Sequence, residues 1–165
     1  MTGFLKGALL CSLATLAVAQ PAQAAMSCWD QKATSAAKLR DLQSRLMVAT
    51  LRCRAMGIDV YGSYNGFVKA NRVTIQTAND TLKQKFNAAY GKAGQTHYDR
   101  FTTALANAYG GDATNSQVCD ETKDVAREAM RANGNFERLV AIQDRFGEEQ
   151  RLPGGTCRDS FAARR

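Results

Sequence analysis

Apolar residues recur at every third or fourth position along most of the chain, which is the spacing of one face of an α-helix. The clearest example covers residues 30–56, where no proline interrupts the pattern and Gly57 follows it. Its apolar positions are Leu39, Leu42, Leu46, Ala49, Cys53 and Met56. Charged residues fall on a different face, at Lys38, Asp41, Arg45 and Arg52. The pattern predicts a long helix with one buried row.

A second apolar row runs through residues 59–91 and contains one polar position, Asn71. The row consists of Tyr64, Phe67, Asn71, Ile75, Ala78, Leu82, Phe86 and Ala89. We expect a second helix here, which ends at Gly91. Because a buried amide without a partner is unfavourable, Asn71 must either find a polar partner or mark a bend.

Three shorter patterns with the same spacing follow, over residues 96–109, 114–133 and 136–146. No stretch of useful length alternates between apolar and polar residues as a half-buried strand would. We therefore predict an all-α fold, an antiparallel bundle of four to five helices. It would form a single helical domain over residues 26–165, with a basic C-terminal tail.

The first 25 residues have the order of features that is typical of a secretory signal peptide. Lys6 precedes an apolar stretch over residues 7–19, and Pro21 and the small-residue sequence Ala-Gln-Ala come next. The apolar stretch is shorter than the roughly 20 residues that a membrane-spanning helix needs. We expect residues 1–25 to be cleaved, which would leave a protein of the periplasm or extracellular space without a transmembrane anchor.

Cleavage would remove Cys11 and leave Cys28, Cys53, Cys119 and Cys157, an even number that predicts two disulfides in an oxidising compartment. At 1.5 Å per residue, a continuous helix would hold Cys28 and Cys53 about 37 Å apart, far beyond disulfide distance. Two connectivities then remain. We favour Cys28 with Cys119 and Cys53 with Cys157, because the short third helix would leave Cys119 near the Cys28 end.

The chain carries 22 Lys and Arg against 15 Asp and Glu, a formal net charge of +7. Much of the excess lies on the first helix and in the tail, at Lys32, Lys38, Arg40, Arg45, Arg52, Arg54, Arg158, Arg164 and Arg165. Such a charge favours anionic envelope surfaces or polyanions. Aromatic residues do not alternate with the basic ones on the first helix, and no nucleic-acid-binding motif occurs, so we expect no specific nucleic-acid binding.

His97 is the only histidine, and Asp99 lies two residues after it, so a general base oriented by a carboxylate is conceivable. No nucleophile motif accompanies the pair, and a single histidine excludes metal sites that need two. We expect a surface or capping role for His97 and no catalytic residue in the chain.

Three acidic residues, Asp120, Asp124 and Glu128, are spaced four apart along one helical row that could gather a divalent cation. Lys123, Arg127 and Arg131 run beside them at the same spacing, which is typical of a solvated, self-neutralising helix face. The chain also lacks a glycine-rich phosphate loop. We therefore expect no metal and no cofactor.

Residues 57–67 combine three aromatic side chains with three glycines. Tyr61, Tyr64 and Phe67 are the best candidates for a recognition patch, because aromatic side chains anchor partners at small entropic cost. Alternatively, they cover one end of the apolar core, as Trp29 would at the other end.

Several short sequences resemble those of small exported bacterial helical proteins with four cysteines. They are Cys28-Trp29, Leu51-Arg52-Cys53-Arg54, Tyr98-Asp99-Arg100-Phe101, and the run from Ala104 to Gly110. The resemblance implies an exported helical domain, and it transfers no catalytic or binding residue to this chain.

These observations favour a non-catalytic periplasmic or secreted helical protein that binds an envelope component or a protein partner. Two alternatives stay open at this point. The first is a small secreted hydrolase that uses His97 with an unidentified carboxylate. The second is a structural or stress-protective protein of the cell envelope.

Overall fold

The computed structural model describes residues 28–146 and 152–157, and all helices within these ranges are α-helical except one short 3-10 turn. In chain order the elements are α1 (Gln31–Ala55), α2 (Tyr61–Ala70), α3 (Arg72–Tyr90), η1 (Gly91–Ala93), α4 (Gly94–Ala108), α5 (Ser116–Arg131) and α6 (Phe136–Phe146). The predicted all-α fold with two disulfides is confirmed. The predicted signal peptide, with Cys11, and the basic tail, with Arg158, Arg164 and Arg165, lie outside the described residues.

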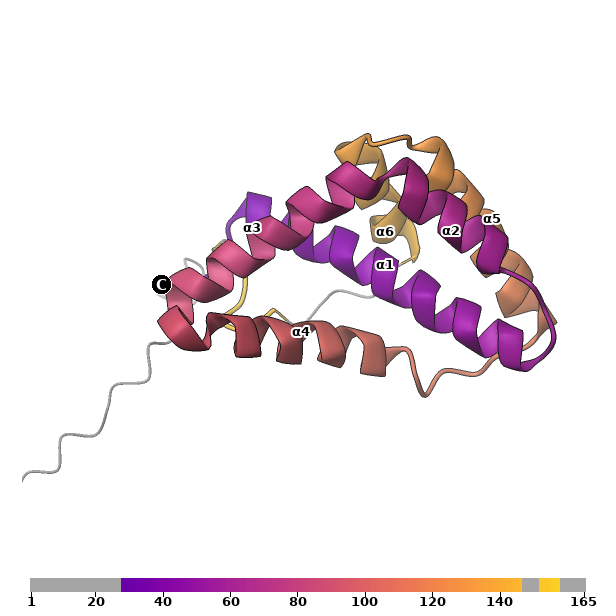
Figure 1. Cartoon of the computed structure of the whole chain (residues 1–165), viewed down its shortest axis with the longest axis horizontal. Helices are drawn as coiled ribbons and strands as arrows, with labels where there is room; N and C mark the ends of the chain where they lie inside the picture. The colour runs from indigo at the N-terminus through magenta and orange to yellow at the C-terminus, as the bar shows by residue number, and fades with distance from the viewer. Residues whose placement is uncertain (1–27, 147–151, 158–165) are drawn as a thin grey trace, which may run out of the picture.

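Helix α1 is the centre of the molecule and packs against each of the five other α-helices. In Figure 1 it runs between α2 and α3 on one side and α4 on the other. The side chain of Asp30 accepts a hydrogen bond from the Ala33 N–H, which satisfies one free donor at the start of α1. At the other end Gly57 adopts a positive φ of 76°, a conformation that glycine tolerates best.

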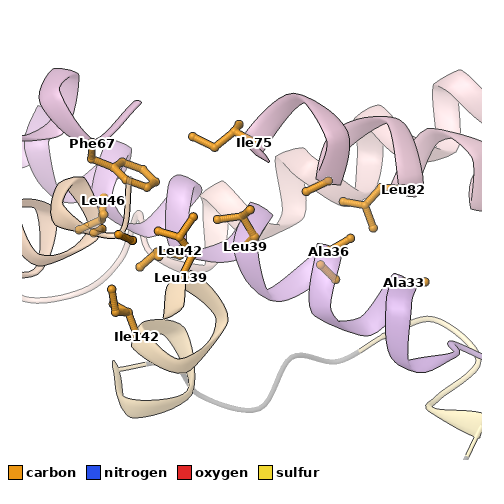
Figure 2. Close-up of a cluster of buried hydrophobic side chains, with 14 of the residues drawn as sticks. Ala33, Ala36, Leu39, Leu42, Leu46, Phe67, Ile75, Leu82, Leu139 and Ile142 are labelled. Atoms are coloured by element: carbon orange, nitrogen blue, oxygen red, sulfur yellow. The ribbon is translucent and has the colours of Figure 1, made fainter. Parts of the chain in front are cut away.

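The predicted apolar row of α1 forms the core with side chains from α2, α3 and α6. Leu39, Leu42 and Leu46 are each at most 2% exposed. Figure 2 shows the α1 side chains facing Phe67, Ile75, Leu82, Leu139 and Ile142. The end of the row was predicted wrongly, because Met56 lies beyond the last packed turn and is 48% exposed. None of the described helices combines the length and apolarity that crossing a membrane requires.

The row over residues 59–91 forms two helices, and the break between them is at Asn71. Asn71 is 1% exposed, and its Nδ2 donates to the carbonyl oxygens of Phe67 at 2.8 Å and Ala129 at 2.9 Å. Its Oδ1 accepts from the Gly134 N–H at 2.7 Å. Asn71 therefore both marks a bend and finds partners, and it ties this bend to the turn between α5 and α6.

The disulfides join Cys28 to Cys157 and Cys53 to Cys119. The exclusion of a Cys28–Cys53 bridge is confirmed, but the connectivity that we favoured is wrong. The error lies in the position of Cys119, which the structure places at the Cys53 end of α1.

The direction of each helix explains this position. Helix α3 returns to the start of α1, where Lys85 Nζ donates to the Cys28 carbonyl oxygen at 2.8 Å. Helix α4 then runs back, and Arg52 donates to the Tyr109 carbonyl oxygen just after it at 2.8 Å. Helix α5 therefore begins beside the C-terminal end of α1, with Cys119 in its first turns.

Candidate functional site

The structure separates the three aromatic residues that the sequence suggested as a recognition patch. Phe67 is fully buried in the core, and Tyr64 is half-buried with its ring centre 6.2 Å from that of Phe67. Tyr61, at the start of α2, is 55% exposed. Tyr64 and Phe67 therefore cover the core, as the alternative interpretation proposed, and Tyr61 faces solvent.

Tyr61 belongs to a surface that we call the α1–α2 corner, which consists of Leu51, Arg54, Met56, Ile58 and Tyr61. Six large apolar side chains are exposed within residues 28–146 and 152–157, and three of them lie here. Leu51 is 60% exposed, Met56 48% and Tyr61 55%. Arg54, Ile58 and Tyr61 also line one shallow hollow together with Gly57 and Asp59. Exposed apolar side chains near the end of one helix and the start of the next are candidates for an interaction surface.

A small second core lies directly beneath this corner. It contains the Cys53–Cys119 disulfide, whose two cysteines are fully buried, and Val60, which is 1% exposed. Ile58 packs against this core from the surface side. The end of α1 is therefore joined to α5 by a covalent bond, and the core around this bond contains few apolar residues.

The structure brings His97 to an aromatic ring rather than to a carboxylate. Its imidazole stacks on the ring of Tyr90, with ring centres 3.6 Å apart and an angle of 4° between the planes. Asp99 is exposed and accepts a hydrogen bond from Gln95 Nε2 at 2.8 Å. The neighbouring residues in the sequence thus do not form an acid–base pair in space.

Two members of the acidic row on α5 pair with arginines, one of them with the predicted Arg127 on the same helix. Asp124 lies 3.5 Å from Arg127 on the same helix, and Glu128 pairs with Arg145 of α6. In the part of the chain that the structure describes, no three His, Cys, Asp or Glu side chains gather as metal ligands would.

Sequence reasoning missed a buried polar cluster formed by Asp41, Tyr109 and Gln143. Asp41 is 2% exposed, and its Oδ2 accepts from the Tyr109 hydroxyl at 2.8 Å and from Gln143 Nε2 at 2.6 Å. Burial raises the pKa of Tyr109 above its usual value, and the hydrogen bond to the Asp41 carboxylate raises it further. The hydroxyl therefore keeps its proton and holds Tyr109 in one orientation.

Asp41 was assigned to a charged face because it lies off the main apolar row of α1. The structure covers that face with α6 and the residue that follows α4. A signal was present in the row itself, since Ala37 and Ser44 lie one turn to either side of Asp41 and are at most 1% exposed. Small residues on both sides of a carboxylate indicate that another helix can approach closely.

A groove with a volume of about 240 Å³ lies beside this cluster, between α1, the connection from α4 to α5, α5 itself and the end of α6. Tyr109 lines it, together with charged side chains of both signs and several apolar ones. The charged lining residues are Arg45, Arg52, Asp112 and Glu121. The groove and the α1–α2 corner share no lining residue.

No family of known proteins, no curated protein and no solved structure matches this chain.

Proposed function

We propose that the protein is a non-catalytic binding protein of the periplasm or extracellular space, which docks an envelope component or a protein partner on the α1–α2 corner. The observation that carries the proposal is the exposure of Leu51, Met56 and Tyr61 at the end of α1 and the start of α2, where the Cys53–Cys119 disulfide joins α1 to α5. The other three exposed large apolar side chains among the described residues, Val73, Met130 and Phe146, belong to α3, α5 and α6.

Two features support the compartment. The four cysteines that would remain after signal-peptide cleavage are all paired in disulfides, which persist in oxidising compartments. The resemblance to small exported four-cysteine proteins agrees with this location.

The corner has the physical properties that favour docking. Tyrosine is enriched among the residues that dominate binding energy, and Arg54 adds a cation beside Tyr61. Because the Cys53–Cys119 bridge restrains the backbone at the end of α1, binding would cost less backbone entropy there.

Photo-crosslinking in the cells that produce the protein tests the proposal. A photo-reactive phenylalanine analogue replaces Tyr61 in one variant and Val73 in the other. Val73 is a matched control, since it is 74% exposed at the start of α3 and lies outside the corner. We expect a discrete adduct from position 61 that position 73 does not form.

The adduct must also depend on the neighbouring apolar side chains. Replacing Leu51 and Met56 by serine should abolish it, while the circular dichroism spectrum and melting temperature stay those of the parent. Equal adducts from positions 61 and 73, or an adduct that survives the serine replacements, would show that the corner does not dock a partner.

A further inference from the structure

The groove beside Tyr109 presents opposite charges on opposite walls. Arg45 and Arg52 project from α1, whereas Asp112 lies on the connection before α5 and Glu121 on α5. Both arginines are half-buried, and both carboxylates are exposed. The groove is therefore polarised across its width, with the better-shielded charges on the cationic side.

These charges do not neutralise one another. Among residues 28–146 and 152–157, no ion pair includes Arg45, Arg52, Asp112 or Glu121. Lys38 on the same helix, in contrast, lies 2.6 Å from the Asp144 carboxylate. One guanidinium nitrogen of Arg52 donates hydrogen bonds to the carbonyl oxygens of Tyr109 and Gly110, at 2.8 and 3.0 Å.

Arg45 is the exceptional member of the group. Arg45 is half-buried, and within the described part of the chain its side chain makes no hydrogen bond or ion pair, while its positive charge acts on the nearby Tyr109. A guanidinium in partial isolation from water binds a carboxylate more strongly than an exposed one does, because two parallel hydrogen bonds replace lost hydration. Arg45 is therefore available to bind a carboxylate in the groove.

Most of the remaining lining residues are apolar, with Thr114 and Thr122 as polar exceptions. Val118 and Val125 of α5 and Phe146 at the end of α6 line the groove together with Leu46 and Ala49 of α1. Tyr109 is fixed at both ends, since its hydroxyl bonds to Asp41 and its carbonyl oxygen to Arg52. Tyr109 would therefore need little rearrangement when a ligand binds.

We propose that this groove binds a free α-amino acid with an aliphatic side chain. The carboxylate lies against Arg45, the ammonium group faces Glu121 and Asp112, and the side chain packs on Val118 and Val125. The volume of about 240 Å³ lies below the roughly 300–1,000 Å³ of sites for drug-sized ligands, so it suits one small molecule such as an amino acid. This site acts independently of the α1–α2 corner.

Titration of the disulfide-bonded protein with L-leucine, followed by nuclear magnetic resonance, tests the proposal. We expect saturable shifts of the Arg45 side-chain and Glu121 backbone signals, with a dissociation constant of about 1 mM or tighter, as suits a ligand of about nine non-hydrogen atoms. N-acetylleucine lacks the ammonium charge and leucinamide lacks the carboxylate. Each should bind at least about tenfold more weakly.

Three variants test which residues bind the carboxylate and the ammonium group of leucine. Arg45→Gln should weaken leucine binding at least about tenfold, and Glu121→Gln should restore part of the relative affinity of N-acetylleucine. Arg100→Gln, at an exposed arginine on α4, should leave binding unchanged. Circular dichroism checks that each variant folds. If a variant does not fold, the comparison of the three ligands on the wild-type protein still tests the proposal.

Three results would overturn the proposal. The first is the absence of saturable shifts with leucine at concentrations about tenfold above the expected dissociation constant. The second is binding of N-acetylleucine or leucinamide as tight as that of leucine, which would show that the groove does not recognise both charges. The third is unchanged leucine binding in folded Arg45→Gln protein.

Discussion

The aromatic side chains at the two ends of α1 differ in burial. At the Cys28 end the aromatic side chains are inside: Trp29 is 1% exposed, and its ring centre lies 5.9 Å from that of Phe86 and 5.5 Å from that of Phe101. At the Cys53 end Tyr61 and its apolar neighbours face solvent. One end is thus held by aromatic packing, and the other leaves an aromatic residue free for contact.

The burial of the two disulfides differs in the opposite sense from the burial of the aromatic side chains. Cys53 and Cys119 are fully buried, whereas Cys28 and Cys157 are half-buried at the surface. The outer bridge attaches residues 152–157 across Trp29, where hydrogen bonds add to it: Trp29 Nε1 donates to the Pro153 carbonyl oxygen at 2.8 Å. One end of α1 thus combines aromatic packing with an accessible disulfide, and the other end combines a buried disulfide and a small core with exposed apolar side chains.

The largest difference between the two ends should appear in the free energy of unfolding. Trp29→Ala removes a buried ring that contacts two others, so we expect a loss of about 3–5 kcal/mol. Tyr61→Ala should change the value by about 0.5 kcal/mol or less, because its side chain is exposed. Urea denaturation followed by circular dichroism measures both. Similar losses for the two variants would contradict the contrast between the ends.

The second difference concerns the reactivity of the bridges towards a dithiol reductant under native conditions. Attack on Cys53–Cys119 requires the fold to open first, so we expect its reduction to be on the order of 100-fold slower than that of Cys28–Cys157. Thiol labelling and mass spectrometry identify the reduced pair.

Trp29 reports the same event in a second way, because it is the only tryptophan of the chain. Reduction of the outer bridge should release residues 152–157 and shift the tryptophan emission to longer wavelength. A Cys28→Ser, Cys157→Ser double variant should show the shifted emission before any reductant is added. Simultaneous reduction of the two bridges would refute the difference in burial.

The smallest predicted effect is on the pH dependence of the free energy of unfolding. It distinguishes Tyr109, near the Cys53 end, from Tyr98, near the Cys28 end. Burial raises the pKa of both, and the Asp41 hydrogen bond raises that of Tyr109 further. The folded protein therefore keeps these protons at a pH where the unfolded chain, with tyrosine pKa values near 10, releases them. Stability is unaffected below about pH 10 and falls as the pH rises above it.

Tyr109→Phe should make the decrease in the free energy of unfolding with pH less steep. The change in slope should correspond to at most about one proton per molecule in unfolding measurements from pH 9 to 12. Tyr98→Phe should reduce the slope less, since its hydroxyl only reaches Asn79, at 3.3 Å. An equal change of slope in both variants would show that Asp41 contributes little at Tyr109.

The sequence by itself determined the features that depend on neighbouring residues in the chain. The spacing of Leu39, Leu42 and Leu46 predicts α1 because a helix places these positions on one face. The same geometry excludes a Cys28–Cys53 bridge. At Asn71, a single polar residue in an apolar row was enough to predict a partner or a bend, because a buried amide needs hydrogen bonds.

Only the tertiary structure decided which faces are covered and which ends meet. Periodicity shows that Asp41 shares a row with Ala37, but the burial of that row depends on α6, more than ninety residues later in the chain. The partner of Cys119 likewise depends on the summed directions of α2, α3 and α4. Because a helix has one repeating pattern but can be contacted from every side, its covered faces are determined by the packing of its neighbours.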